Sequence, residues 1–194
     1  YGVGRTPTAE ELRRMDISIS HEGTELPPGR GNAKEGAQVY VQKACVGCHG
    51  ATGIGGMAPI LRSTKGADVP VWKKERILPL RSPYATTVWD YINRAMPWNN
   101  PKTLSHDEVY AVTAFLLSLA EVVPDDFVLS HQNIAEVQKR MPNRNGMTTA
   151  HAMWPGKEFN GTAKPDTANV ACMKDCIPEA KVASMLPDHA RNAH

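Results

Sequence analysis

The feature that most constrains this chain is the run Cys45-Val46-Gly47-Cys48-His49. A C-x-x-C-H pattern is typical of covalent haem attachment, because two thiols three positions apart at a helix end can reach both vinyl groups on one porphyrin edge. The next residue, His49, directs its imidazole at the iron, and Gly47 lets the backbone lie close to the ring. A thioredoxin-like redox pair would need a preceding strand, and a zinc site would need a second Cys/His pair. The pattern therefore predicts one covalently bound haem c, attached through Cys45 and Cys48 and ligated by His49.

The other two cysteines, Cys172 and Cys176, are a poor second half of a zinc site. They lie far from the first pair with no histidine nearby, and Ile177 in place of a histidine excludes a second haem here. Residues four apart on a helix have Cα atoms about 6 Å apart, which is within the range of a disulfide. We expect a Cys172–Cys176 disulfide that pins a local turn. Two buried free thiols are the alternative.

The sixth ligand of the iron must come from elsewhere in the chain, and a methionine thioether would raise the reduction potential by favouring ferrous iron. Of the eight methionines, Met96 is favoured. It lies well downstream of His49, just past a predicted helix end, and Pro97 fixes the backbone after it. Met57 is too near His49 in sequence to reach the opposite face of the ring easily, and Met141 follows the helix that should close the domain. These two and a histidine are the alternatives.

The composition narrows the classes of function. The net charge is +2 and the Lys and Arg residues are scattered, so nothing favours nucleic acid as a partner. The longest apolar stretch, residues 109–120, is interrupted by Thr113 and Ser118 and is too short to cross a bilayer, which predicts a soluble protein. Tyr1 in place of a methionine indicates a removed signal peptide or the limit of the expressed chain, and the local cysteine pairs favour an oxidising compartment or a cofactor.

The helix-start signals in the sequence predict an all-α protein, and the sequence shows no evident strand or internal repeat. The expected helices span about residues 9–15, 33–44, 83–95, 106–120 and 131–140. The residues expected to cap their starts are Thr8, Asn32, Ser82, Ser105 and Ser130. A long glycine-containing loop, residues 47–82, is explained by a large cofactor that it wraps. We therefore divide the chain into an N-terminal arm (1–31), a haem domain (32–123) and an irregular C-terminal extension (124–194).

Residues 30–123 resemble the class I cytochrome c family. Gly36 and Tyr40 on the first helix of the haem domain and Phe115 on the last match the crossing of terminal helices in that fold. Ala58-Pro59-Ile60-Leu61 resembles the loop whose proline carbonyl accepts a hydrogen bond from the axial histidine. The resemblance thus implies that Pro59 fixes the tautomer of His49 and strengthens its donation to iron. A simple loop proline is the alternative.

A narrower resemblance extends over most of the chain. Residues 83–98, which end in Ala95-Met96-Pro97-Trp98, are similar to the cytochrome subunits of the Sox sulfane dehydrogenase and of related sulfite dehydrogenases. Residues 2–5, 105–115 and 141–146 fit the same family. The resemblance implies a periplasmic complex in which a molybdenum-containing catalytic subunit oxidises a sulfur compound. Electrons pass to the haem and then to a soluble cytochrome c, and this chain would have no catalytic centre beyond the haem. Some members carry a second haem domain, whereas this chain has one C-x-x-C-H motif.

Two other classes of function compete with a dehydrogenase subunit. A free-standing periplasmic electron shuttle would usually be little more than the haem domain, and residues 124–194 count against it. A haem enzyme such as a peroxidase needs an open sixth position, and Met96 counts against that. Residues 124–194 hold few large apolar side chains, so we expect this extension to dock on the catalytic partner. Packing back onto the haem domain is the alternative.

Overall fold

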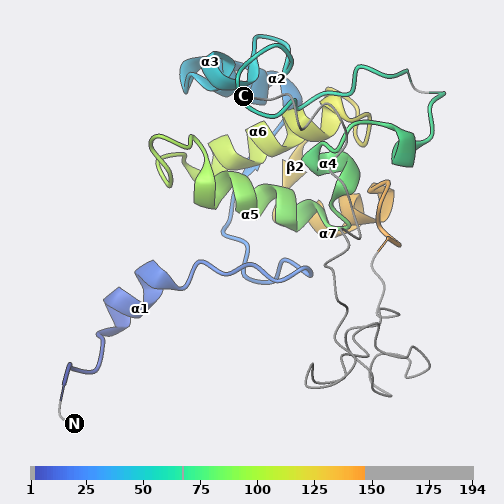
Figure 1. Cartoon of the computed structure of the whole chain (residues 1–194). Coiled ribbons are helices and arrows are strands. Elements are labelled where there is room, and N and C mark those ends of the chain that lie inside the picture. Colours follow the sequence, from blue (N-terminus) through green and yellow to red (C-terminus); the bar gives the residue numbers. More distant parts are fainter. Residues whose placement is uncertain (1–2, 67, 147–194) are drawn as a thin grey trace, which may run out of the picture. The chain divides into compact units, whose positions relative to one another are not determined.

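Figure 1 shows a computed structural model of the chain, in which residues 3–66 and 68–146 are described. The expectation of a helical fold is confirmed. The longer helices are α1 (Ala9–Met15), α2 (Ala33–Gln42), α5 (Ala85–Ala95) and α6 (His106–Leu119). Short turns of helix are α3 (Cys45–His49), α4 (Leu78–Arg81) and α7 (Ile134–Val137), with 3₁₀ turns at Val71–Lys73 and Gln138–Arg140. Two strands of two residues each, β1 (Arg30–Gly31) and β2 (Leu129–Ser130), were not predicted.

Reciprocal capping boxes begin three of the helices, where the sequence predicted them. In each, the capping side chain accepts a hydrogen bond from the third backbone N–H of the helix, and a glutamate there accepts one from the N–H of the capping residue. The pairs are Thr8 and Glu11 for α1, Asn32 and Glu35 for α2, and Ser105 and Glu108 for α6. These contacts are local, so the sequence alone is enough to place the helix starts.

The predicted start of α5 at Ser82-Pro83 is wrong by two residues. The Ser82 N–H donates to the carbonyl of Leu78 and ends α4, while its hydroxyl donates to the Tyr84 carbonyl at 2.7 Å. Because that hydroxyl closes a turn, Tyr84 lies in extended conformation before α5 without a side-chain cap. Ser130 does not cap a helix either: α7 begins after Asn133, whose Oδ1 accepts a hydrogen bond from the Ser130 N–H.

The crossing of α2 over α6 is the tightest helix contact described. A Cβ built on Gly36 would lie 2.6 Å from the Ala111 carbonyl carbon and 2.7 Å from Cβ of Phe115, where ordinary contacts are 3.4–4 Å. The Tyr40 and Phe115 rings are in contact, with centroids 5.4 Å apart. Glycine at position 36 therefore lets the two backbones meet, in the way that the resemblance to class I cytochromes c implied.

Helix α5 lies beside α6 (Figure 1), and side chains of both belong to the core. The Trp89 and Tyr110 side chains are fully buried between them, with ring centroids 5.4 Å apart. The same core includes residues from both flanks of the predicted haem domain: Leu26, Leu129, Ile134, Val137 and Met141. The flanks are therefore part of the domain's hydrophobic core.

The segment before α2, residues 17–31, is here called the N-terminal strap. It is tied to α5 by a hydrogen bond from the Thr86 hydroxyl to the His21 carbonyl, 3.3 Å, and to α6 by one from the Tyr110 hydroxyl to the Pro27 carbonyl, 2.9 Å. It ends in β1, which pairs antiparallel with β2, placing Arg30 opposite Ser130. This pairing joins the arm to the extension, across both boundaries drawn at 31 and 123.

Residues 124–146 thus pack back onto the haem domain, which was the alternative to docking on a partner. Residues 147–194, with Cys172 and Cys176, lie outside the described residues, so the disulfide stays a prediction. Within the described part of the chain, no helix is both long and apolar enough to cross a membrane.

Candidate haem-binding site

The two cysteines of the motif lie on α3, which a sharp backbone turn separates from α2. Ala44 makes that turn in the left-handed conformation, φ 58°. Cys45 and Cys48 are three apart on a helix, so their side chains lie on one side of it. The Cys45 thiol is half-buried, and this burial raises its pKa, with a smaller contribution from the neighbouring Cys48. Cys48 is exposed, and neither cysteine is in a disulfide.

The imidazole of His49 is held by a backbone carbonyl. Its Nδ1 lies 2.8 Å from the Pro59 carbonyl oxygen. That oxygen can only accept a hydrogen bond, so Nδ1 carries the proton and the Nε2 lone pair is left for a metal. The structure thus contains the contact between His49 and Pro59 that the resemblance implied. Such a hydrogen bond fixes the orientation of a ligating imidazole and raises its basicity.

The loop between these two residues folds tightly on itself. Gly50 has φ +80°, and a Cβ there would lie 2.7 Å from the carbonyl carbon of Ile54. The Ala58 N–H donates to the Cys48 carbonyl at 2.8 Å. The Tyr40 hydroxyl donates to the Gly50 carbonyl at 2.7 Å, and burial raises the Tyr40 pKa to about 12. These bonds place the Pro59 carbonyl beside the imidazole.

The sequence showed Tyr40 only as part of the helix crossing, and this second role was missed. No short-range pattern links a tyrosine on a helix to a carbonyl in the following loop. The available signal was its position on α2, about one turn before Cys45. A hydroxyl there can reach the backbone that follows the motif.

The methionines of the described residues differ sharply in their surroundings. Met96 follows the last residue of α5 and packs partly buried against the core. Met57 is 91% exposed, whereas Met141 is 3% exposed and lies within the core. Met96 is therefore the one of these three that is neither fully exposed nor fully enclosed by the core.

The residues present fit a haem c. Cys45 and Cys48 lie one helical turn apart and directly precede His49, whose Nδ1 is hydrogen-bonded to the Pro59 carbonyl. The alternatives fit less well, because a helix and not a strand precedes the cysteines. Across residues 3–66 and 68–146, no cluster of three or more His, Cys, Asp and Glu side chains could hold a zinc ion.

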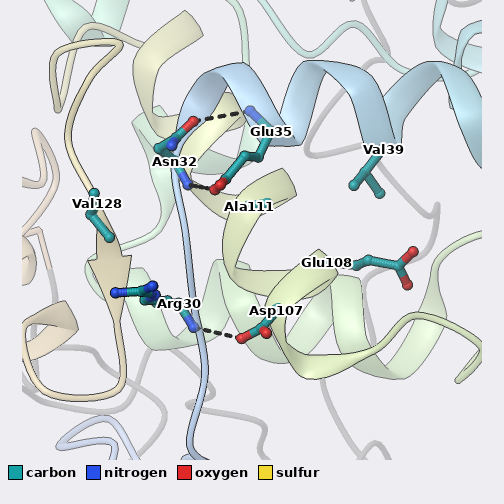
Figure 2. A pocket seen from close by; sticks show the side chains of 8 residues that line it. All are labelled: Arg30, Asn32, Glu35, Val39, Asp107, Glu108, Ala111 and Val128. Atoms are coloured by element: carbon teal, nitrogen blue, oxygen red, sulfur yellow. Dashed lines mark hydrogen bonds between the residues drawn. The ribbon is translucent and has the colours of Figure 1, made fainter.

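A cavity of about 510 Å³ lies elsewhere, between α2, α6 and the strands (Figure 2). It contains none of the motif residues, and its polar groups already serve the fold: Asn32 and Glu35 cap α2, and the Arg30 N–H donates to Asp107. The cavity is lined by Arg30, Asn32, Glu35, Val39, Asp107, Glu108, Ala111 and Val128. It is therefore distinct from the candidate haem site.

Comparison with known proteins places this geometry in a family. The sequence profile of cytochrome c matches residues 33–120. Among solved structures, a chain in the crystal structure of the sulfane dehydrogenase SoxCD from Paracoccus pantotrophus is 31% identical, with a TM-score of 0.68, over 99% of this chain and 89% of that chain. This chain belongs to the cytochrome c family. A search of curated protein sequences returned no match.

The cytochrome c family is defined by covalently attached haem c and by electron transfer, and both apply to this chain. The expected resemblance to the sulfane dehydrogenase cytochromes is confirmed by the structural similarity. The matched residues span α2 to α6, and so include the motif, the Pro59 loop and Met96.

Proposed function

We propose that this cytochrome c binds its haem through Cys45 and Cys48, with His49 and Met96 as axial ligands and Pro59 as the hydrogen-bond partner of His49. The observation that carries the site is the 2.8 Å contact between His49 Nδ1 and the Pro59 carbonyl, directly after two cysteines one helical turn apart on α3. When bound, the haem supplies a one-electron ferric/ferrous couple. The Pro59 carbonyl holds the imidazole in one orientation, and the Met96 thioether favours the ferrous state.

Two matched variants test the ligand assignment. Met96→Leu and Met141→Leu each replace a thioether by a hydrocarbon of similar volume, which limits the cost in packing. We expect Met96→Leu to abolish the weak far-red charge-transfer band of a Met–ferric bond and to lower the reduction potential, while Met141→Leu leaves both unchanged. If Met141→Leu removes the band and Met96→Leu does not, the assignment to Met96 is wrong.

We further propose that the chain is the electron-transfer subunit of a periplasmic sulfane or sulfite dehydrogenase. In this role it accepts electrons from a molybdenum-containing catalytic subunit and passes them to a soluble cytochrome c. The identity of 31% to a SoxCD chain, over nearly the whole length of both chains, supports this role. The test is to purify the cytochrome from its native host, identify what co-purifies, and add sulfite or a protein-bound sulfane. Reduction of the haem that requires both the substrate and the co-purified subunit is the expected result.

A free-standing monohaem shuttle to a terminal oxidase or reductase is the second candidate. The observation that favours it is the packing of Leu129, Ile134 and Met141 into the core, because part of the extension then serves this domain and not a partner. A shuttle would purify as a monomer with no stable partner and would be reduced by small donors alone.

Because residues 124–146 pack on the haem domain, we propose only residues 147–194 as the segment that docks on the catalytic subunit. A chain that ends at Gly146 keeps β2, α7 and Met141, and with them all the core residues described above. We expect this shortened chain to keep its haem spectrum and to lose the stable complex with the catalytic subunit. If it still binds and is reduced at the full-length rate, the segment does not dock.

A further inference from the structure

One guanidinium ties the N-terminal strap to the helix that ends at Met96. Nη2 of Arg94 donates to the Ile17 carbonyl at 3.1 Å. Nε and Nη2 of the same side chain donate to the Asp90 carboxylate at distances of 2.9 to 3.2 Å. Arg94 lies in the last turn of α5, two residues before Met96. Through this residue, the strap is bonded directly to the end of α5.

The geometry of this tie is fixed by Asp90. The two side chains are four residues apart on one face of α5, with the acid nearer the N-terminus, which is the favourable order for such a pair. A guanidinium fork that meets a carboxylate with two nitrogens has little orientational freedom. The side chains are 44% and 24% exposed, so the pair is only partly in water. Asp90 thus orients Arg94 toward the strap.

Met96 depends on this last turn of α5. Its N–H donates to the Ile92 carbonyl at 3.1 Å and makes the terminal hydrogen bond of the helix. The residues that follow, 98–103, are exposed, and Leu104 is the next buried side chain. Besides its packing against the core, Met96 is therefore anchored through the last turn of α5, and Arg94 bonds that turn to the strap.

The strap leads from this point straight into α1. The Ile17 N–H donates to the Met15 carbonyl at 3.1 Å, and the helix exposes Leu12 (54%) and Met15 (82%). Any protein that engages α1 would act on the chain within a few residues of the Ile17–Arg94 bond.

We propose that Arg94 is a positioning residue for Met96, which couples the N-terminal strap to the axial ligand of the haem. Loosening the strap frees the last turn of α5 and weakens the hold of Met96 on the iron. This inference rests on the proposed ligation by Met96.

The test measures the ligand and the strap separately in the full-length ferric protein. Imidazole competes with a Met ligand for the iron, so its apparent association constant reports how firmly Met96 is held. Loss of one charge-assisted hydrogen bond at a half-exposed site should raise that constant about fivefold in Arg94→Gln. Hydrogen–deuterium exchange of the peptide that covers residues 9–22 should become faster in the same variant. Asp90→Asn should shift both readouts in the same direction by less.

Lys139→Met is the matched control. It removes an exposed ion pair with Glu136 that is far from the strap in sequence, and it should move neither readout. If Arg94→Gln raises imidazole binding without faster exchange in the strap, or the reverse, the coupling is refuted. If Met96→Leu leaves imidazole binding unchanged, the ligand assignment itself fails, and that result is distinct from a failure of Arg94 alone.

Discussion

Gly36→Ala tests the crossing of α2 over α6, which lies just before the haem motif on α3. By helix propensity alone, alanine in the middle of α2 should stabilise the protein by about 1 kcal/mol. At this position, however, the new Cβ would lie 2.6 Å from the carbonyl carbon of Ala111, where at least 3.4 Å is normal. Helix propensity predicts that the substitution raises the free energy of unfolding, and the clash predicts that it lowers it. The variant therefore decides between the two effects.

The clash should outweigh the gain in helix propensity. The group it meets is backbone, which cannot move away by changing a rotamer, so α2 and α6 must separate by close to an ångström. Overpacking of a core contact typically costs about 1–3 kcal/mol, and a backbone clash belongs at the upper end. After the gain in propensity, we expect a net loss of about 2 kcal/mol, or about 4–8 °C in Tm for a chain of this size.

Urea unfolding of the ferric protein, followed by far-ultraviolet circular dichroism and by the haem absorption, measures this loss. Gln38→Ala, at an exposed position of the same helix, is the control and should shift the midpoint little. If Gly36→Ala is as stable as the parent or more stable, α2 and α6 do not meet closely enough at Gly36 for a Cβ to clash with Ala111, and the predicted loss of stability is wrong.

Three further predictions concern the strap, the long loop and the C-terminal cysteines. Tyr110→Phe leaves the Pro27 carbonyl without its hydrogen bond and should cost about 1 kcal/mol in the free energy of unfolding, measured in urea. Hydrogen bonds from two hydroxyls of the loop lower the pKa of Glu75 from 4.5 to about 2, so its contribution to stability is present above pH 4.5 and is lost as the pH falls toward 2. Glu75→Gln should flatten that part of the profile of urea midpoint against pH, and an unchanged slope would contradict the assignment. Alkylation of the denatured, unreduced protein, followed by mass analysis, should label neither Cys172 nor Cys176, and two labels would refute the disulfide.

Much of the fold could be predicted because its signals are local. The capping boxes at Thr8, Asn32 and Ser105 need only four neighbouring residues, and each was placed correctly. The two strands could not be predicted, because two-residue strands have no period and their partners lie a hundred residues apart. The predicted cap at Ser82 was wrong because a serine can close a turn as readily as it caps a helix, and only the contacts of α4 decide which it does.

The packing of residues 124–146 was missed for a different reason. The apolar content of the extension is low on average, but its first part contains Leu129, Ile134, Val137 and Met141, which are nearly fully buried. At the site, the motif alone predicted the thiols and His49. Pro59 entered only through the resemblance to a family, because nothing in the residue pattern points a particular carbonyl at the imidazole.

The joining of both flanks in one core has a consequence for how the protein matures. Leu26 and Met141 belong to the same cluster, so the core cannot close until the chain has been synthesised as far as residue 141. A growing chain displays Cys45 and Cys48 long before that point, on a segment whose eventual neighbour α6 has not yet formed. The thiols are thus accessible to covalent attachment before the core closes. The pairing of β2 with β1 can form only after residues 129–130 have been made, and so it follows the stage at which both cysteines are exposed.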